Sequence, residues 1–517
     1  MKRFLSLSIS TLISSLLLAG GIVTNQNQSA MYTRLQARDA TLGIDAVFYN
    51  PAGLTLLPNN GLFLSLNNQY ITQERTIKSD YPALNEGTYK GAIDAPLFPG
   101  LYVGYKLDDW AFSFGFNPIG GGGGGIYDAG LPSFEYSISD LPSALPDVNA
   151  YQVDAYFEGS SVYFGYQANV SYKINDMIQV AAGVRYVDAQ EAYNGYLKNT
   201  QLNLSDNWVT ATAYFQGAAA TAAGGMQGLS TNGLGGQTLL FAFENGFITQ
   251  EQYAGMAGGL PDPTVTIDEG LAVYNAGADG YTARSVLLDD QSVDYEKSAT
   301  GFTPILSVNI NPHEKFNIAL KYEFNTTLEF TNKTTEDFTV GFDPATGAPI
   351  TMFPDGATSN LDIPALLSIG LTYNPLDDLM ISTGFHYYFD KNANWDGREE
   401  ELESNSWEFG LGAEYKFSEK FLASLGYLRT KSYATDDYQT DLSFTLPSHT
   451  IGGGIAYQVM PLLGINLSAA YTTYDEGTRD FSHDFAQSGN LIAVQESYQK
   501  PLMIIALGLN FNFSAGK

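Results

Sequence analysis

Residues Met503–Phe513, MIIALGLNFNF, alternate between large apolar side chains and residues that are mostly small or polar. A period of two residues is typical of a β-strand with one apolar face. The same alternation occurs at 463–471 and at 407–416. It predicts an all-β fold. A water-soluble sandwich alternates in the same way, so the pattern alone does not identify a membrane barrel.

The ends of these segments favour the membrane barrel. Many apolar faces finish in an aromatic residue beside a short polar turn, as expected of side chains at the interface between lipid and water. Charged residues mostly lie on the opposite face, because a lipid-facing Lys or Arg near the midplane costs ~2–4 kcal/mol. The aromatic residues are Tyr105, Tyr172, Tyr373, Tyr415 and Tyr457, and the charged ones are Lys173, Arg185, Lys321, Glu323, Glu408 and Glu414.

Fourteen such segments follow one another after residue 60, and the connections between them are alternately tight and long. Short periplasmic turns and long outer loops are typical of outer-membrane barrels. We therefore predict an all-β, transmembrane antiparallel β-barrel of about 14 strands. The segments are 61–77, 98–107, 110–118, 154–174, 177–196, 289–310, 314–332, 359–374, 378–390, 402–416, 419–433, 443–458, 462–475 and 495–513.

The start of the chain is typical of a secretory signal peptide. A basic segment, Met1–Arg3, precedes an apolar run to Leu18 and small residues at 19–21. The run is shorter than the roughly 20 residues that a helix needs to cross a bilayer. We assign residues 1–20 to a signal peptide cleaved near 19–21. No later stretch approaches that length, so we expect no helical membrane span.

The composition excludes several classes of protein. A formal net charge of −30 argues against nucleic-acid binding, which needs a basic surface. The absence of cysteine excludes disulfides and thiolate metal sites. The 34 tyrosines and 31 phenylalanines suit strands and interfacial girdles. We predict no metal and no cofactor.

Residues 21–58, GIVTNQNQSAMYTRLQARDATLGIDAVFYNPAGLTLLP, are neither signal nor strand. Read locally, Asn50-Pro51-Ala52-Gly53 is only a turn. In its context, behind a signal peptide and directly before the first strand, the stretch resembles the FadL family of outer-membrane transporters for hydrophobic compounds, whose N-terminus is a small hatch with an Asn-Pro-Ala motif. The resemblance implies a hatch at 21–58 within a barrel formed by 59–517. Fourteen strands enclose more space than side chains fill, which leaves room for a plug.

The motif is a candidate gate at the periplasmic mouth. A buried asparagine amide can satisfy several groups of the barrel wall, proline stiffens the turn, and alanine permits close packing. The alternative is that the motif merely ends the hatch. The hatch and gate candidates are Asn50, Pro51, Ala52 and Gly53.

Three further segments resemble the family. Proline opens a strand in Leu361–Ala365 and in Phe444–His449, where a strand tolerates it. The segment Trp110–Ile119 resembles a family strand whose inward kink opens a gap in the wall. A flexible outer loop is the favoured alternative for the glycine run 120–125. The wall-gap candidates are Pro118, Gly120, Gly121 and Gly122.

The loop at 197–288 is longer than a barrel requires, and a loop of this length is usually functional. The resemblance implies outer helices that form a hydrophobic groove for ligand capture. A helical cap with an ordinary apolar face is an equal alternative. The capture candidates are Leu239, Leu240, Phe241, Phe243 and Phe247.

We find no catalytic constellation. The histidines His313, His386, His449 and His483 are scattered without metal-ligand spacing, and a GxSxG elbow is absent. A remote alternative, by analogy with barrel lipases, is His386 acting with an inward-facing serine on a neighbouring strand.

The expected function is transport of hydrophobic compounds, with long-chain fatty acids implied by the resemblance. Expected partners are such a ligand, outer-membrane lipid and lipopolysaccharide, for a monomeric protein in the outer membrane of a Gram-negative bacterium. The alternatives are a structural or adhesive barrel that transports nothing, and a polar-solute porin.

Overall fold

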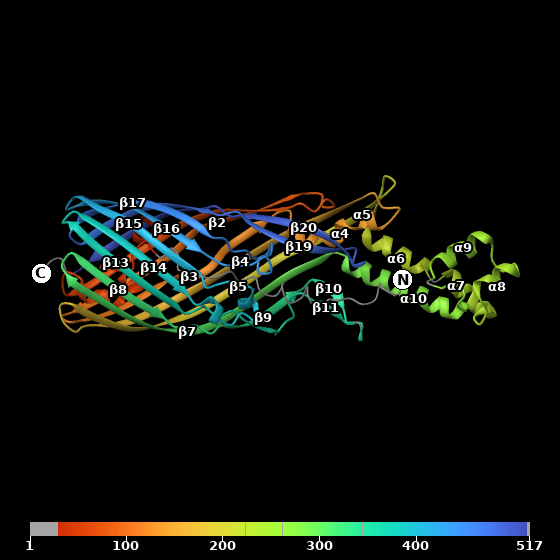
Figure 1. Ribbon diagram of the computed structural model, residues 1–517, viewed down its shortest axis with the longest axis horizontal. Helices are drawn as coiled ribbons and strands as arrows, with labels where there is room; N and C mark the ends of the chain where they lie inside the picture. Colours follow the sequence, from red (N-terminus) through yellow and green to blue (C-terminus); the bar gives the residue numbers. More distant parts are fainter. Residues whose placement is uncertain (1–28, 223, 261, 344, 514–517) are drawn as a thin grey trace.

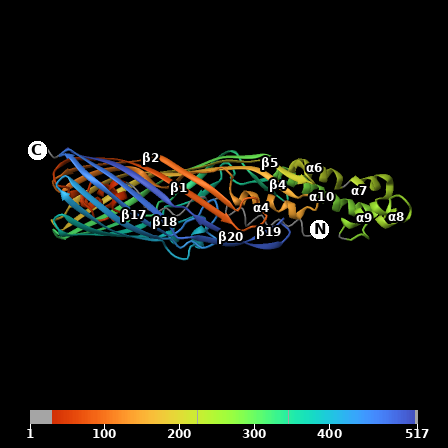
Figure 2. The same ribbon diagram turned by 90° about the horizontal axis from the view of Figure 1, so that it is seen from above.

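A computed structural model describes residues 29–222, 224–260, 262–343 and 345–513. The predicted signal peptide and the first residues of the predicted hatch, 21–28, lie outside these ranges. Figures 1 and 2 show a long cylinder of tilted strands with a helical head at one end.

The cylinder is a closed antiparallel barrel with fourteen strand positions around its wall, which confirms the predicted fold class. We call each of these positions a stave. Most staves are single strands, and four are interrupted and made of two. The single strands are β1 (Gly61–Ser79), β2 (Thr88–Leu107), β3 (Trp110–Tyr127), β4 (Ala150–Lys173), β5 (Ile178–Leu204), β7 (Gln291–His313), β14 (Leu379–Tyr388), β15 (Trp407–Ser418), β16 (Phe421–Lys431) and β17 (Ser448–Met460). The interrupted staves are β8 (Phe316–Glu323) with β9 (Glu329–Glu336), β12 (Thr358–Asn360) with β13 (Leu366–Leu376), β18 (Leu463–Tyr474) with β19 (Gly477–Phe485), and β20 (Asn490–Gln499) with β21 (Leu502–Asn512).

The last stave closes the barrel on the first. β1 pairs with β21 from Phe63↔Asn512 to Gln73↔Leu502, and then with β20. Closure pairs the backbone groups of the first stave with those of the last, as a membrane requires. The short turns between staves, such as residues 108–109 and 419–420, lie at the end opposite the helical head (Figure 1).

Several strands are longer than the sequence pattern indicates. β2, β3 and β5 contain 20, 18 and 27 residues, more than the predicted segments 98–107, 110–118 and 177–196 and more than the 9–11 that cross a membrane. They carry the wall well beyond any membrane-spanning belt. The glycine run 120–125 is also in a strand, because β3 continues through it to Tyr127. The flexible-loop interpretation of this run is therefore wrong.

The helices lie at the head end, apart from those of the hatch. α4 (Pro132–Ser139) and α5 (Leu141–Ala144) fold inward between β3 and β4. A hairpin strand, β6 (Asn207–Thr210), leads into the head. None of the helices in the described ranges is long and apolar enough to cross a membrane. The head comprises α6 (Ala211–Ala222), α7 (Gly224–Leu229), the π-turn η3 (Ser230–Leu234), α8 (Leu239–Glu244), α9 (Gln250–Gly258) and α10 (Ile267–Leu287). Smaller outer elements are β10 (Thr339–Phe342), β11 (Pro349–Thr351), η4 (Asp390–Asn392) and η5 (Arg398–Glu401).

Two clusters of buried side chains divide the interior. We call the part around the hatch, near the short turns, the lower lumen, and the part nearer the head the upper lumen. The upper lumen contains an aromatic cluster to which seven staves and the outer loops contribute: Ile77, Tyr89, Tyr127, Leu131, Phe134, Phe157, Tyr193, Val293, Tyr295, Phe338, Phe353, Phe444, Leu446 and Tyr498.

The outer face near the short turns is apolar. Exposed aliphatic and aromatic residues recur on neighbouring staves, as the alternation predicts. Aromatic pairs such as Trp110 with Tyr172 and Phe316 with Tyr373, each with ring centroids 4.6 Å apart, stand beside the turns. Members of this belt include Leu66, Phe114, Val170, Val184, Leu306, Leu371, Leu411, Leu425, Ile451, Leu467 and Ile505.

Candidate functional site: the hatch and the gap in the barrel wall

The hatch, residues 29–58, has three short helical turns and is almost wholly buried. α2 (Ala30–Arg34) begins where the Ser29 side chain accepts a hydrogen bond from the backbone of Tyr32. Two more turns follow, α3 (Ala46–Tyr49) and η2 (Pro51–Leu56), and proline at the first position of η2 suits its fixed φ. Helices this short cannot be stable alone, so the wall must hold them.

The Asn-Pro-Ala motif lies against four neighbouring staves of the wall. The Asn50 amide donates to Asn309 Oδ1 of β7 at 2.7 Å, and its own oxygen accepts from the Gly53 amide at 3.3 Å. The Pro51 carbonyl accepts from the Ser171 hydroxyl of β4 at 2.7 Å. Asn309 in turn donates to Gln179 of β5 and Asn317 of β8, so the motif joins a chain of amides around the wall.

Gly53 is required by packing rather than by its backbone angles. A Cβ at this position would lie 2.5 Å from Asn50 Nδ2 and 2.9 Å from Leu42 Cδ2. Ala52 is fully buried, and its backbone amide faces the Ser307 hydroxyl at 3.5 Å. The four gate candidates are thus brought together at one wall contact. Their role as a gate remains a prediction.

Charged side chains fix the remainder of the hatch. Arg34 donates to Glu414 of β15 and to Ser424 of β16. Arg38 makes a bidentate pair with Asp45, with N–O distances of 2.7 and 2.8 Å, inside the hatch itself. Each of these guanidinium groups is buried together with an opposite charge, which burial demands.

His386 of β14 bridges the hatch and the wall. Its Nε2 lies 2.7 Å from Asp39 Oδ1 of the hatch, and its Nδ1 lies 2.9 Å from Glu408 Oε2 of β15. Ser368 lies directly opposite His386 in the ladder between β13 and β14. Both ring nitrogens already contact carboxylates, so neither is turned toward Ser368 as a serine hydrolase would need.

A row of glycines in the wall receives the hatch backbone. These glycines pair with one another across β13 to β17, and we call the row the glycine track. A Cβ on Gly426 would lie 2.7 Å from the Gln36 amide nitrogen, and one on Gly370 would lie 2.6 Å from that of Ala40. Side chains here would push the hatch away. The track consists of Gly370, Gly384, Gly410, Gly412, Gly426 and Gly452.

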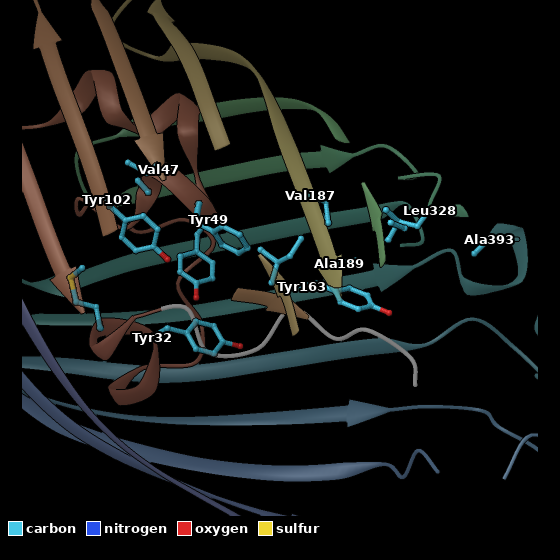
Figure 3. Packing of buried hydrophobic residues seen from close by; sticks show 14 of the residues in the cluster. Tyr32, Val47, Tyr49, Tyr102, Tyr163, Val187, Ala189, Leu328 and Ala393 are labelled. Carbon is cyan, nitrogen blue, oxygen red and sulfur yellow. The ribbon is translucent and has the colours of Figure 1, made fainter. Parts of the chain in front are cut away.

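The hatch also has an aromatic contact with the wall. Tyr32 and Tyr49 stack with ring centroids 5.1 Å apart and lie beside Tyr102 of β2 (Figure 3). The Phe48 ring lies 4.7 Å from the Arg185 guanidinium and 4.9 Å from Lys321 Nζ. These two cations share the Glu323 carboxylate, at 2.6 and 2.7 Å. Below the hatch, a cavity of about 360 Å³ opens between Ile44, Phe63, Gln458, Pro461 and 510–512.

The ladder between β2 and β3 is interrupted beside the hatch. The strands pair from Leu101↔Phe116 to Leu107↔Trp110, and again only at Ala92↔Ile126. Residues 93–100 and 117–125 between these points, all of them described, do not pair with each other. Pro96 and Pro99, which lack N–H donors, lie in this part of β2.

β3 keeps its pairing with β4 by bulging at the wall-gap candidates. The register shifts between Pro118 and Gly120 and again between Gly120 and Gly123. Gly121 has a φ of 91°, and a Cβ there would lie 2.6 Å from the Ser161 carbonyl carbon, so only glycine fits. Pro118, Gly120, Gly121 and Gly122 therefore lie at the kink beside the interrupted ladder.

The kink and the hatch share one hydrophobic cluster. Ile119, at the bulge, is buried in the same cluster as Val47 and Phe48 of the hatch. The gap in the wall and the plug in the lumen are therefore neighbours within one packed cluster.

Several solved structures share the fold of this chain. No family model and no curated protein matches the chain. Among solved structures, a Pseudomonas aeruginosa FadL homologue matches with a TM-score of 0.60 at 14% identity, covering 96% of this chain and all of that one. The Pseudomonas putida toluene transporter TodX matches at 0.52 and 12% identity, covering 95% and 99%, and the Ralstonia pickettii toluene transporter TbuX at 0.50 and 14%, covering 95% and 100%.

The protein has the FadL-type barrel fold. At this level of identity the likeness concerns the fold, and it extends over nearly the whole chain.

The head of this FadL-type barrel places the capture candidates differently from one another. Leu239 is fully buried in the small core of the head, and Phe243 stacks on Tyr253 at 5.3 Å. Leu240, Phe241 and Phe247 are exposed, Phe247 by 57%. Part of the set therefore forms the core of the helical head and part faces outward, and a role in ligand capture stays a prediction.

Sequence reasoning misses several residues that hold the hatch of the FadL-type barrel. Asp39 and His386 are 347 positions apart, and Arg34 and Glu414 are 380 apart, so no local pattern connects them. The alternation places Glu408 and Glu414 on the inner face but does not identify their partners. The glycine track has a signal in the alternating Gly410 and Gly412, although by itself that signal indicates only the small face of a strand.

Proposed function

We propose that the protein is an outer-membrane channel for the uptake of hydrophobic compounds, with long-chain fatty acids as the expected ligands. The observation that carries this proposal is the interruption of the ladder between β2 and β3 directly beside the hatch. A plug alone would also suit a structural barrel. A plug next to an opening in the wall suits the passage of a molecule from the lumen into the bilayer.

The path begins at the head and ends at the wall gap. Exposed Leu240, Phe241 and Phe247 offer apolar surface for capture, and the aromatic cluster of the upper lumen accepts the ligand next. Burial stabilises an acyl chain by ~0.8 kcal/mol per CH₂, so a long chain leaves slowly unless the protein moves. A shift of the hatch, coupled through Ile119 to the kink of β3, supplies that movement.

The ligands named for the similar solved structures support the proposed class of ligand. Two of the similar structures are toluene transporters, and a third is a FadL homologue. We extend to this chain the transport of small hydrophobic molecules. The preference for a fatty acid over an aromatic hydrocarbon is part of our proposal.

Uptake of radiolabelled oleate by cells that express the protein tests the proposal. Replacing Asn50 by Ala removes the hydrogen bond to Asn309 and should lower uptake several-fold, while the amount of heat-modifiable barrel stays unchanged. Asn194→Ala makes the same substitution on the exposed face of β5 and is the control. The proposal is wrong if wild-type cells take up no more oleate or toluene than cells without the protein.

A further inference from the structure

Two basic side chains face each other in the upper lumen. The ladder pairs Thr76 with Gln499 and Gln73 with Leu502, which places Lys500 opposite Arg75. Arg75 is on the same face of β1 as the fully buried Ile77, and Lys500, directly after the end of β20, is two residues past the fully buried Tyr498. Both therefore point toward the aromatic cluster.

The position is beyond the membrane belt. On the outer face of β1, Leu66 and Tyr70 are followed by polar residues at 72, 74, 76 and 78. Arg75 is fourteen residues past Gly61, and a strand tilted by about 45° rises well over 25 Å in that distance. The pair lies on the head side of the hatch, where a ligand arrives first.

Neither cation has a carboxylate partner within the described part of the chain. Five other cations buried in the barrel or hatch each have one within 3.0 Å, although acids outnumber bases 55 to 25 in the whole chain. Arg75 and Lys500 are half-buried, but an unpaired charge that has lost much of its water is still costly, so two of them side by side call for a physical reason. The five paired cations are Arg34, Arg38, Arg185, Lys297 and Lys321.

The contacts of the two cations are with rings and neutral oxygens. The Phe444 ring centroid lies 5.2 Å from Lys500 Nζ and 6.0 Å from the Arg75 guanidinium carbon. Lys500 Nζ donates to the Phe444 carbonyl at 2.8 Å, and Arg75 Nε donates to Gln73 at 3.0 Å. The face of the Phe444 ring attracts both cations weakly through its negative electrostatic potential. An anion would attract them more strongly.

Electrostatics at the site agrees with this geometry. Burial, together with the nearby positive charge of Arg75, lowers the pKa of Lys500 to about 7. A bound anion would offset the positive charge of Arg75 and raise the pKa of Lys500 again, because a nearby negative charge favours the protonated lysine.

The surroundings suit an apolar tail. The Phe444 ring stacks on Tyr498 at 4.8 Å, and the Tyr127 ring occupies the space above Gly91, the residue opposite Arg75 on β2. Tyr474 lies with its ring centroid 5.2 Å from Lys500 Nζ. A molecule with its charge between the cations would lie with its tail among these rings.

We propose that Arg75 and Lys500 form a binding site for the carboxylate of a ligand that has an apolar tail. The site rests on the proposed function and deepens it, because it selects amphipathic carboxylates among hydrophobic compounds. Phe444, from the segment between β16 and β17, covers the site before the ligand arrives and lies against the tail when it is bound.

Binding of oleate and of oleyl alcohol to the purified full-length protein in lipid nanodiscs tests the site. The two probes share a tail and differ in the charge of the head group. The double variant Arg75→Met/Lys500→Met should bind oleate at least about tenfold more weakly, as expected for the loss of charge-assisted hydrogen bonds, and oleyl alcohol within about twofold of wild type. Lys500→Arg, which keeps the charge, should retain the oleate affinity.

Lys90→Met is the matched control. It removes the same charge from the exposed face of β2, where Lys90 contacts Glu74 at 3.3 Å, and should change neither affinity. If the double variant does not assemble into a heat-modifiable barrel, Lys500→Gln replaces it, with the same expected loss of selectivity.

The outcomes separate the site from the channel. Wild-type protein that binds neither probe contradicts the proposed function. Wild-type protein that binds both probes equally, or variants that lose both equally, contradict the carboxylate site and leave the channel in place.

Discussion

The lower and the upper lumen handle charge in opposite ways. In the lower lumen acids and bases pair directly, as Arg34 does with Glu414 and Arg185 with Glu323. In the upper lumen the pairing is weaker. Glu496 accepts hydrogen bonds from Tyr136 and Tyr498 and has its nearest cation, Arg479, at 3.9 Å. The bases Arg75 and Lys500 lie against aromatic rings.

This difference distinguishes a region that holds the hatch in place from a region that can bind a ligand. Paired charges satisfy each other and fix one arrangement, which suits a plug that must stay in place. Cations without a nearby carboxylate can instead bind the negative charge of a ligand. The predictions below remove or test one side of this contrast at a time, beginning with the largest expected effect.

Removing the hatch should open the lower lumen. Deletion of residues 21–57 takes away the plug while every strand of the barrel remains, because β1 begins at Gly61. Liposomes that contain the deletion variant should swell rapidly in small sugars, and liposomes with the intact protein should not. Impermeability of the deletion variant would mean that the hatch does not seal the lumen.

A side chain on the glycine track should displace the hatch without removing it. Gly426→Val places methyl groups where the Gln36 backbone now lies, since the Cβ alone would come within 2.7 Å of the Gln36 nitrogen, and valine favours the strand. We expect sugar permeability between those of wild type and the deletion variant. Gly453→Val on the same sheet is the control, since its nearest contact would be 3.3 Å, to Ser424 of the neighbouring strand. Equal leakage in both variants would show that the glycine track does not determine the position of the hatch.

Breaking one buried pair should loosen the hatch locally. Arg34→Met leaves Glu414 buried without its cation and should lower the free energy of hatch opening by ~3–5 kcal/mol. Hydrogen exchange of the hatch amides measures this change. Lys333→Met, which breaks an exposed pair with Glu296, should change stability by less than ~1 kcal/mol. Protection of the hatch that is unchanged in Arg34→Met would show that packing alone holds it.

The acids of the upper lumen, beyond the membrane belt, should make α4 sensitive to pH. Burial, with the charge of Asp441 added, raises the pKa of Glu496 to about 7, against hydrogen bonds from Tyr136 and Tyr498 and the charge of Arg479. The protonated form is favoured in the folded state, so this contribution to stability is complete below about pH 4.5 and is lost as pH rises through 7.

Glu496→Gln tests this dependence. It should abolish the decline in hydrogen-exchange protection of α4 between pH 5 and 8, a change of on the order of 1–3 kcal/mol. Glu296→Gln, at an exposed position, should leave the decline in place. A pH profile of the Glu496→Gln variant that matches wild type would assign the decline to another group.

The regular part of the fold follows from sequence because its causes are local. Alternation on strands such as β21 and short turns such as 419–420 repeat around the barrel, and each repeat is visible within about twenty residues. The predicted segments for β2, β3 and β5 are too short, because these strands continue above the apolar belt, where the outer face is no longer apolar.

The irregular parts depend on distant neighbours. Six consecutive glycines indicate a loop when read locally, yet pairing with β4 keeps them in a strand. The Asn-Pro-Ala motif is recognisable by resemblance, but its contacts with Ser171 and Asn309 arise only when the barrel has closed. The same holds for Arg75 and Lys500, which lie at opposite ends of the barrel sequence and meet because β1 pairs with the last stave.

The glycine track also dictates an order of events during folding. The hatch leaves the ribosome first, but its seat is built from β13 to β17, more than 300 residues later in the chain. Contacts of such long sequence separation form slowly, because the intervening chain must first be ordered. The seat does not exist until those staves have paired. Docking of the hatch is therefore a late step. A barrel with its hatch docked must already have paired β13 to β17 correctly.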